Sequence, residues 1–214
     1  MKGYIFDLDG TLTNTLNAIA HFGNSALEAY GMEAIETERY KEFVGDGRDV
    51  LIHRMLSVYD NDTQEMFEKV REVYDAGYEA DYLYETDAYD GIRELLNELK
   101  AKGKKLAICS NKPDNVARFV VDTIFGADFF DAVTGQKPEV KTKPSPDMAI
   151  NTAKEMGLSP DECFFIGDTN VDIFTGKNAG IKTIGVLWGF RGIDELKDAG
   201  ADYIVSKPAQ IAEL

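Results

Sequence analysis

Two aspartates follow the first apolar run of the chain and are separated by a single residue. Asp7 and Asp9 stand between the run Tyr4–Phe6 and the turn residue Gly10. Because alternate residues of a strand share a face, this spacing predicts two carboxylates side by side, roughly 7 Å apart. Two negative charges that close repel each other unless a cation lies between them or one keeps its proton. The pair therefore indicates a nucleophile beside a proton-transferring group, or, as the alternative, a strand that simply ends in a polar turn.

A serine, an asparagine and a lysine occupy further positions where an anion could bind. Ser110 and Asn111 follow the apolar run 105–109, and backbone N–H groups at the start of the next helix can point at an anion. Lys143 lies in a loop with two prolines, which stiffen the backbone and can aim an ammonium group. Taken singly, Ser110 and Asn111 are equally typical of a turn or cap, and a loop lysine is usually a solvated charge.

Two more acids lie four residues apart around the start of a predicted helix. Asp168 and Asp172 follow the apolar run 163–167. As purely structural residues, they fit an N-capping aspartate and a first-turn acid that complements the helix dipole. As functional residues, they fit a site for a hard cation, because Mg²⁺ prefers a few carboxylate oxygens together with water and phosphate.

These sites have a common position relative to the predicted strands. Open α/β sheets bind ligands at the carboxyl ends of their strands, so we expect the sites to meet at one edge. Up to four carboxylates gathered there require a divalent cation, while a hydroxyl, N–H groups and a lysine supply the donors that phosphate oxygens need. The pattern predicts phosphoryl transfer to a carboxylate.

The elements that must position these residues alternate between strands and helices. Continuous apolar runs, typical of strands covered on both faces of a parallel sheet, lie at 4–8, 105–109, 163–167, 183–187 and 203–205, with a weaker one at 129–133. Helical patterns lie at 92–100, 113–125, 147–156 and 171–178. The alternation predicts an α/β fold with a doubly wound, mostly parallel, Rossmann-like sheet.

One interval interrupts this alternation. Between Leu12 and Lys105 about ninety residues contain no convincing strand, whereas a crossover between parallel strands needs only about a dozen. Helical spacing recurs there instead, at 16–30, 37–44, 48–59 and 63–78. We therefore expect an inserted all-helical domain over residues 14–82, a return linker over 82–88, and a core made of residues 1–13 and 83–214.

Composition restricts the partners and the location. With Lys+Arg 23 and Asp+Glu 38 the formal net charge is −15, and such a surface repels nucleic acid and anionic membranes, so neither is an expected partner. Cys109 and Cys163 lie in apolar runs without metal-like spacing, which is typical of reduced, buried thiols. The first strand follows Met1 closely and no run is long enough to span a bilayer, so we expect a cytoplasmic protein, either monomer or homodimer.

In their order along the chain, the motifs resemble those of the haloacid dehalogenase superfamily of phosphohydrolases. They are Asp7-Leu8-Asp9-Gly10-Thr11, Ser110 at a strand end, Lys143 before Pro144, and Gly167-Asp168-Thr169 with Asp172. The resemblance implies that Asp7 is the nucleophile, which forms an aspartyl-phosphate. It implies that Asp9 protonates the leaving oxygen and then activates water.

The resemblance also implies a cofactor and a phosphate site. Mg²⁺ would be held by the carboxylates of Asp7 and Asp168 and the backbone carbonyl of Asp9, and Asp172 would support the metal or hold Lys143. Ser110, the Asn111 backbone and, within the first motif, Thr11 would contact the substrate. Lys143 would balance the charge on Asp7 and the phosphate, because a carboxylate that attacks a phosphate dianion faces strong repulsion.

Two features of the resemblance concern the substrate. Dehalogenases lack an acid at the position of Asp9, because halide leaves without a proton, so the resemblance implies a phosphatase. The inserted helices are similar to the α-helical cap of the phosphoglycolate phosphatase and phosphomutase branch. The loop Val44–Arg48 matches that branch's cap loop, in which Gly47 lets the backbone approach the site and Arg48 binds a second anionic group. A solvated arginine at a helix start is the alternative for Arg48.

The expected function is therefore Mg²⁺-dependent hydrolysis of a small phosphorylated metabolite, with a phosphoglycolate-like substrate first. A pyrophosphatase, a nucleotidase or a β-phosphoglucomutase-like enzyme would use the same residues. A receiver-like signalling module, which also phosphorylates an aspartate beside Mg²⁺, is the alternative from another class. Such a module needs neither the helical insert nor a second acid such as Asp9.

Overall fold

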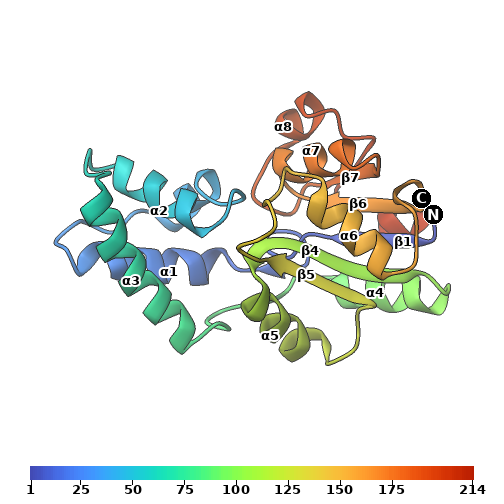
Figure 1. Cartoon of the computed structure of the whole chain (residues 1–214), viewed down its shortest axis with the longest axis horizontal. Helices are drawn as coiled ribbons and strands as arrows, with labels where there is room; N and C mark the ends of the chain where they lie inside the picture. Colours follow the sequence, from blue (N-terminus) through green and yellow to red (C-terminus); the bar gives the residue numbers. More distant parts are fainter. The chain divides into compact units, whose positions relative to one another are not determined.

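A six-stranded sheet forms the centre of one of two compact units in this computed structural model, which describes residues 1–214 (Figure 1). This unit comprises Met1–Asn14 and Ala88–Leu214. Its strands lie in the order β5-β4-β1-β6-β7-β8, and every adjacent pair is parallel. Their bounds are β1 Gly3–Phe6, β4 Lys105–Pro113, β5 Ala132–Gln136, β6 Cys163–Gly167, β7 Lys182–Val186 and β8 Tyr203–Val205. The predicted doubly wound parallel sheet is confirmed.

The central position of β1 creates the place where ligands bind in such sheets. β4 pairs with one edge of β1 and β6 with the other. The chain therefore adds strands on both sides of β1, and the carboxyl ends of β1, β4 and β6 lie together at the switch point of the topology.

Helices cover the sheet. They are α4 Ile92–Ala101, α5 Asp114–Phe125, α6 Asp147–Glu155, α7 Asn170–Asn178 and α8 Ile193–Asp198, with 3₁₀ helices η2 Pro160–Glu162 and η3 Pro208–Glu213. Helix α6 packs against β1, β4 and β5, whereas α7 packs against β6 and β7. In α4 the apolar residues lie three and four positions apart, and Ile92, Leu95, Leu96 and Leu99 are all buried.

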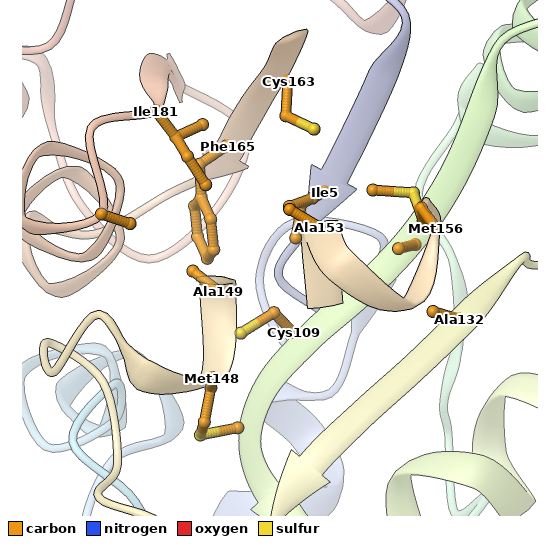
Figure 2. Close-up of a cluster of buried hydrophobic side chains, with 12 residues drawn as sticks. Ile5, Cys109, Ala132, Met148, Ala149, Ala153, Met156, Cys163, Phe165 and Ile181 are labelled. Carbon is orange, nitrogen blue, oxygen red and sulfur yellow. The ribbon is translucent and has the colours of Figure 1, made fainter. Parts of the chain in front are cut away.

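Both faces of the sheet are apolar, as continuous rather than alternating runs require. On one face Ile5, Cys109 and Phe165 pack with Met148 and Ala149 of α6 (Figure 2). On the other face the ring of Phe164 contacts the rings of Tyr4 and Tyr203. Full burial of a large apolar side chain such as Ile5, Phe165 or Met148 stabilises the fold by roughly 1.5–3 kcal/mol. Both cysteines are free and buried, as predicted.

The second unit, Thr15–Asp87, is built from helices. They are α1 Leu16–Glu28, the 3₁₀ helix η1 Thr37–Glu42, α2 Arg48–Ser57 and α3 Gln64–Ala80. Helix α1 packs against α3 and η1, and α2 packs against α3. The helix expected over 37–44 is a 3₁₀ helix that ends at Glu42, and the chain turns at Gly45, where φ is 114°. No helix of the chain has the length and apolar composition needed to cross a membrane.

The segment after α3 differs from the expected linker. The ring of Tyr84 stacks on His21 and contacts Phe22 edge-on, so residues near Tyr84 pack with the helices instead of joining the core. Two short strands, β2 Thr13–Asn14 and β3 Asp87–Ala88, form a separate sheet in the interval expected to lack strands. Elements of two residues are too short to leave a periodic pattern in the sequence.

Several strand boundaries also differ from the expected ones, among them the end of β4, which is Pro113 rather than residue 109. Strand β1 ends at Phe6 rather than at residue 8, because the carbonyl of Leu8 accepts backbone hydrogen bonds from Thr11, Leu12 and Thr13 and so begins a turn. Strand β5 begins at Ala132 rather than at residue 129. The aromatic rings at 129 and 130 pack instead with Phe125 of α5.

Candidate active site

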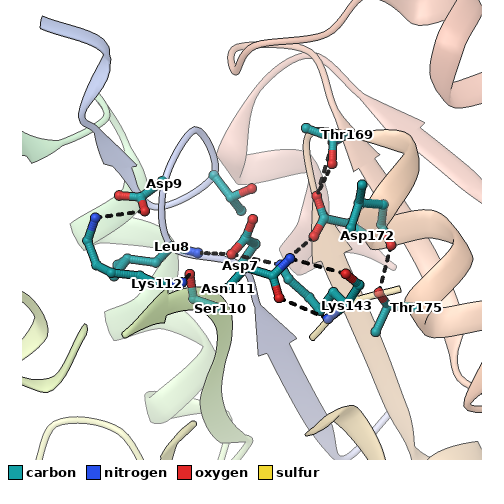
Figure 3. A network of polar contacts seen from close by, with 12 residues as sticks. Asp7, Leu8, Asp9, Ser110, Asn111, Lys112, Lys143, Thr169, Asp172 and Thr175 are labelled. Atoms are coloured by element: carbon teal, nitrogen blue, oxygen red, sulfur yellow. Dashed lines mark hydrogen bonds and ion pairs between the residues drawn. The ribbon is translucent and has the colours of Figure 1, made fainter. Parts of the chain in front are cut away.

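The carboxyl ends of three neighbouring strands bring most of the predicted residues together (Figure 3). Asp7 follows β1 and Asp168 follows β6, while Ser110 lies within β4, which continues past its expected end. The register between β4 and β5 shifts between Cys109 and Pro113, so the segment that contains Ser110 departs from regular pairing. A β-irregularity of this kind commonly reorients side chains beside a functional site.

Three buried carboxylates form a cluster. Oxygen atoms of Asp7, Asp168 and Asp172 lie within 4.8 Å of one another. The pKa of Asp7 is raised to about 7. Burial is the main cause, the positive charge of Lys143 acts against it, and the negative charge of Asp172 raises the pKa further. Burial, followed by repulsion from Asp172 and Asp7, also raises the pKa of Asp168 well above its ordinary value. Negative charge is thus costly here, and three hard oxygen donors this close fit a divalent cation.

Lys143 is a buried cation in contact with two carboxylates of this cluster. Its side chain is 1% exposed, and Nζ lies 2.9 Å from Asp7 Oδ1 and 2.7 Å from Asp172 Oδ1. Burial by itself lowers the pKa of Lys143, but the carboxylates of Asp172 and Asp7 raise it by more. The net shift of the pKa is upward, so the side chain stays charged. The expected proximity of Lys143 to Asp7 is therefore present.

Asn111 holds the backbone of Lys143 in place. Its Oδ1 accepts a hydrogen bond from the Lys143 N–H at 2.9 Å, and its Nδ2 donates to the Lys143 carbonyl at 3.2 Å. The side chain thus links β4 to the lysine loop, a role that the sequence did not suggest. Ser110 is 2% exposed, and its Oγ accepts a hydrogen bond from Lys112 N at 3.3 Å, so its own proton remains to be donated.

Asp172 holds both the lysine and a helix start. Its Oδ1 accepts from Lys143, and its Oδ2 accepts from the N–H and hydroxyl of Thr169 at 3.1 and 2.9 Å. The N-cap of α7 is Thr169, so the alternative interpretation of Asp168 as the capping residue is wrong. Of the two roles expected for Asp172, the hydrogen bonds favour the one that holds Lys143.

The carboxylate of Asp9 lies outside the cluster. Its Oδ2 pairs with Lys112 Nζ at 2.9 Å, and it is not among the three clustered acids. Of the up to four carboxylates expected at this sheet edge, three form the close cluster, and the fourth, that of Asp9, pairs with Lys112 near the end of β4. The strand alternation that places Asp7 and Asp9 side by side ends at Phe6, and Asp9 lies in the following turn, where it forms an isolated bridge with Thr13. The sequence analysis did not predict that Lys112 pairs with Asp9. The one indication in the sequence is that a lysine stands two residues after Ser110.

Thr11 is expected to contact substrate, and that role remains a prediction. Its side chain is fully buried, and its hydroxyl donates to Asp168 Oδ1 at 2.8 Å. The other oxygen of Asp168 accepts from the N–H of Phe190 at 2.8 Å. Trp188 Nε1 donates to the Thr11 carbonyl at 2.9 Å. The sequence gives no indication that a loop some 20 residues after Asp168 returns to it.

Arg48 and Gly47 lie in the helical unit. Gly47, with φ 92°, precedes α2, whose first residue is Arg48. The Arg48 guanidinium pairs with Asp75 at 2.9 Å and with Asp49 at 2.8 Å. A substrate anion that binds Arg48 must therefore compete with these carboxylates, and the anion-binding role remains a prediction.

The chain matches the sequence model of a known family. The family is described as haloacid dehalogenase-like hydrolase, and the match covers residues 4–186. That range contains every residue of the acidic cluster and both lysines.

Several curated proteins and solved structures are similar to the whole chain. The phosphoglycolate phosphatase of Aquifex aeolicus (strain VF5) is 32% identical over 214 residues, which cover 100% of this chain and 96% of that protein. The phosphoglycolate phosphatase of Vibrio cholerae is 31% identical and covers 95% of this chain and 92% of its own length. A crystal structure from Lactobacillus delbrueckii subsp. bulgaricus has a TM-score of 0.95 at 32% identity and covers 99% of this chain and 97% of its own.

Proposed function

Because the chain belongs to the haloacid dehalogenase-like hydrolases, we propose that it is a Mg²⁺-dependent phosphatase of a small phosphorylated metabolite. The observation that carries this proposal is the buried Asp7 in contact with Lys143, within a cluster of three carboxylates. The full-length similarity to two proteins named phosphoglycolate phosphatase makes phosphoglycolate the first candidate substrate. The helical unit Thr15–Asp87 is the proposed cap, and the remainder is the proposed catalytic core.

The proposed reaction has two steps. A carboxylate oxygen of Asp7 attacks phosphorus, and the bond from phosphorus to the leaving oxygen breaks while Asp9 donates its proton to that oxygen. In the second step Asp9 takes a proton from water, the water oxygen attacks phosphorus, and the Asp7 carboxylate leaves as inorganic phosphate forms. General acid–base catalysis of this kind contributes typically about 10²–10⁴-fold to the rate.

The carboxylates of Asp7 and Asp168 would hold the metal, since both belong to the close set of hard oxygen donors. When bound, Mg²⁺ supplies positive charge that offsets the repulsion between the phosphate and the Asp7 carboxylate. Lys143 adds a second positive charge at the same carboxylate, and Asp172 keeps its ammonium group in place. The buried Ser110 hydroxyl is the proposed donor to a phosphoryl oxygen.

Phosphate release tests the proposal. Purified protein is incubated with p-nitrophenyl phosphate and with a panel that includes phosphoglycolate, pyrophosphate and nucleoside monophosphates, each with Mg²⁺ and with EDTA. We expect turnover only with Mg²⁺, and the highest kcat/KM for phosphoglycolate.

Asp7→Asn should abolish turnover with the fold intact, because an amide cannot act as the nucleophile. Activity that survives in this variant contradicts the covalent scheme, and a higher kcat/KM for another member of the panel replaces the candidate substrate.

A further inference from the structure

A loop that the proposed chemistry does not use lies against the metal-binding end of the sheet. It consists of Trp188, Gly189 and Phe190, follows β7, and is called here the 188–190 loop. Its backbone donates to Asp168 through the N–H of Phe190 at 2.8 Å. Its indole donates to the backbone carbonyl of Thr11 at 2.9 Å. The loop therefore joins the turn after β1 to the acid after β6.

The approach of these three segments leaves no space for a further atom. A Cβ atom built on Gly189 would lie 2.3 Å from the Gly10 carbonyl oxygen and 2.4 Å from Asp168 Oδ2. A Cβ atom on Gly10 would meet the Phe190 ring at 2.5 Å. Distances below about 3.0 Å do not occur between real Cβ atoms and their neighbours. Glycine at 189 is thus required by close approach to Asp168, and not by an unusual backbone angle.

Each of the two carboxylate oxygens of Asp168 accepts one hydrogen bond. Oδ1 accepts from the Thr11 hydroxyl and Oδ2 accepts from the Phe190 N–H, each at 2.8 Å. Each carboxylate oxygen has a second lone pair, which is left to bind a cation. The side chain is fully buried beside Asp7 and Asp172, so repulsion acts to turn it away from them. Two hydrogen bonds from neutral donors oppose that rotation without neutralising the charge.

From this geometry we propose that Thr11 and the 188–190 loop are positioning residues that hold the Asp168 carboxylate in its metal-binding orientation and so set the Mg²⁺ affinity of the site. The inference rests on the proposed Mg²⁺-dependent function. Groups that orient a metal ligand typically contribute about 10–100-fold to metal affinity. A purely structural role for the same contacts would change the stability of the fold and leave the affinity unchanged.

Two matched pairs of variants separate these roles. Thr11→Val removes the hydroxyl at nearly constant volume, whereas Thr11→Ser retains it. Gly189→Ala places a methyl group against Asp168, whereas Gly192→Ala adds the same group in the same region with nothing within 4 Å. Gly192 has φ −90°, which alanine adopts freely.

The measurement is Mg²⁺ binding in the absence of substrate. The dissociation constant is obtained by isothermal titration calorimetry and, independently, from the emission of Trp188, the single tryptophan of the chain. Thr11→Val and Gly189→Ala should raise the dissociation constant for Mg²⁺ about 10–100-fold. Thr11→Ser and Gly192→Ala should bind Mg²⁺ as the wild type does. Thermal unfolding in EDTA reports stability separately for each variant.

The outcomes of this experiment distinguish the inference from the proposed function. If the wild type hydrolyses phosphate esters with Mg²⁺ but Thr11→Val and Gly189→Ala bind Mg²⁺ as tightly as the wild type, the positioning role is wrong and the phosphatase proposal stands. If the wild type neither binds Mg²⁺ nor releases phosphate, both are wrong. Should Gly189→Ala fail to fold, the Thr11 pair decides the question alone.

Discussion

Lys112 and Asp9 form an ion pair of 2.9 Å, with their side chains 7% and 20% exposed. A second pair, Lys143 with Asp7, lies at the same end of the sheet. Each of the two acids in the first motif therefore has its own ammonium group, one from the end of β4 and the other from the loop before α6. This separation suits the different proposed tasks of the acids, because a nucleophile and a proton donor must contact opposite sides of the phosphoryl group.

The first prediction concerns Lys112. Lys112→Met removes the charge that holds the Asp9 carboxylate while nearly keeping the side-chain volume. We expect kcat to fall about 10²-fold, since a misplaced catalytic group typically costs that much. Steady-state kinetics with p-nitrophenyl phosphate measure the effect. Lys154→Met, on the exposed face of α6, is the matched control. Equal kcat values for the two variants would show that Lys112 does not position Asp9.

The second prediction concerns the buried lysine. Lys143→Met leaves Asp7 and Asp172 facing each other without a cation, and both carboxylates are buried. Removal of one partner of a buried ion pair destabilises a protein by about 3–5 kcal/mol. Urea unfolding in EDTA gives the free energy of unfolding for the wild type and the variant.

A double variant tests the reason for that loss. Lys143→Met with Asp172→Asn removes one of the two facing charges, so we expect it to be more stable than Lys143→Met alone. A double variant that is less stable than the single one would mean that the loss comes from packing around the lysine stem.

The third prediction concerns pH. The pKa of Asp7 is raised to about 7, first by burial, whereas an unfolded chain has the ordinary value of about 3.9. The unfolded state therefore releases this proton first, and the metal-free protein should lose stability as the pH rises from about 4 through about 7. Mg²⁺ binds the ionised carboxylates and should offset this loss, so it should stabilise the protein more at about pH 8 than at about pH 5.

Thermal unfolding with EDTA and with Mg²⁺ at both pH values checks this. In Asp7→Asn the titrating carboxyl is absent, so the pH dependence of the metal-free protein should be much weaker. An unchanged pH dependence in that variant would assign the effect to other groups. Among these, Asp168 is the first to test, because its pKa is raised as well.

The sequence predicts the sheet well because it depends on local patterns, although the ends of β1 and β4 and the start of β5 differ from the predicted bounds. Continuous apolar runs identify the buried strands, and a polar residue after such a run lies at the sheet edge whatever the rest of the fold does. The pairing of side chains depends on tertiary geometry instead. Thr11 and Asp168 are 157 residues apart, and Trp188 and Thr11 are 177 apart, so no local pattern relates them. The position of Asp9 has a local cause instead, because the strand is replaced there by a turn held by backbone hydrogen bonds to the Leu8 carbonyl.

The last prediction concerns Arg48 of the helical unit. This guanidinium pairs with Asp75 and Asp49, and its side chain is 34% exposed. If Arg48 binds the carboxylate of phosphoglycolate, Arg48→Ala should raise KM for phosphoglycolate about tenfold, which is the lower end for a hydrogen bond to a charged group. KM for p-nitrophenyl phosphate, which has no second anionic group, should not change.

Asp75→Asn sharpens this test because it acts in the opposite direction. It removes a carboxylate that competes for Arg48, so KM for phosphoglycolate should fall or stay constant while the value for p-nitrophenyl phosphate is unaffected. Arg71→Ala, in which the lost guanidinium lies over the ring of Phe67, controls for the loss of positive charge from the same unit. Equal effects of Arg48→Ala on both substrates would mean that Arg48 stabilises the helices through Asp75 and does not recognise the substrate.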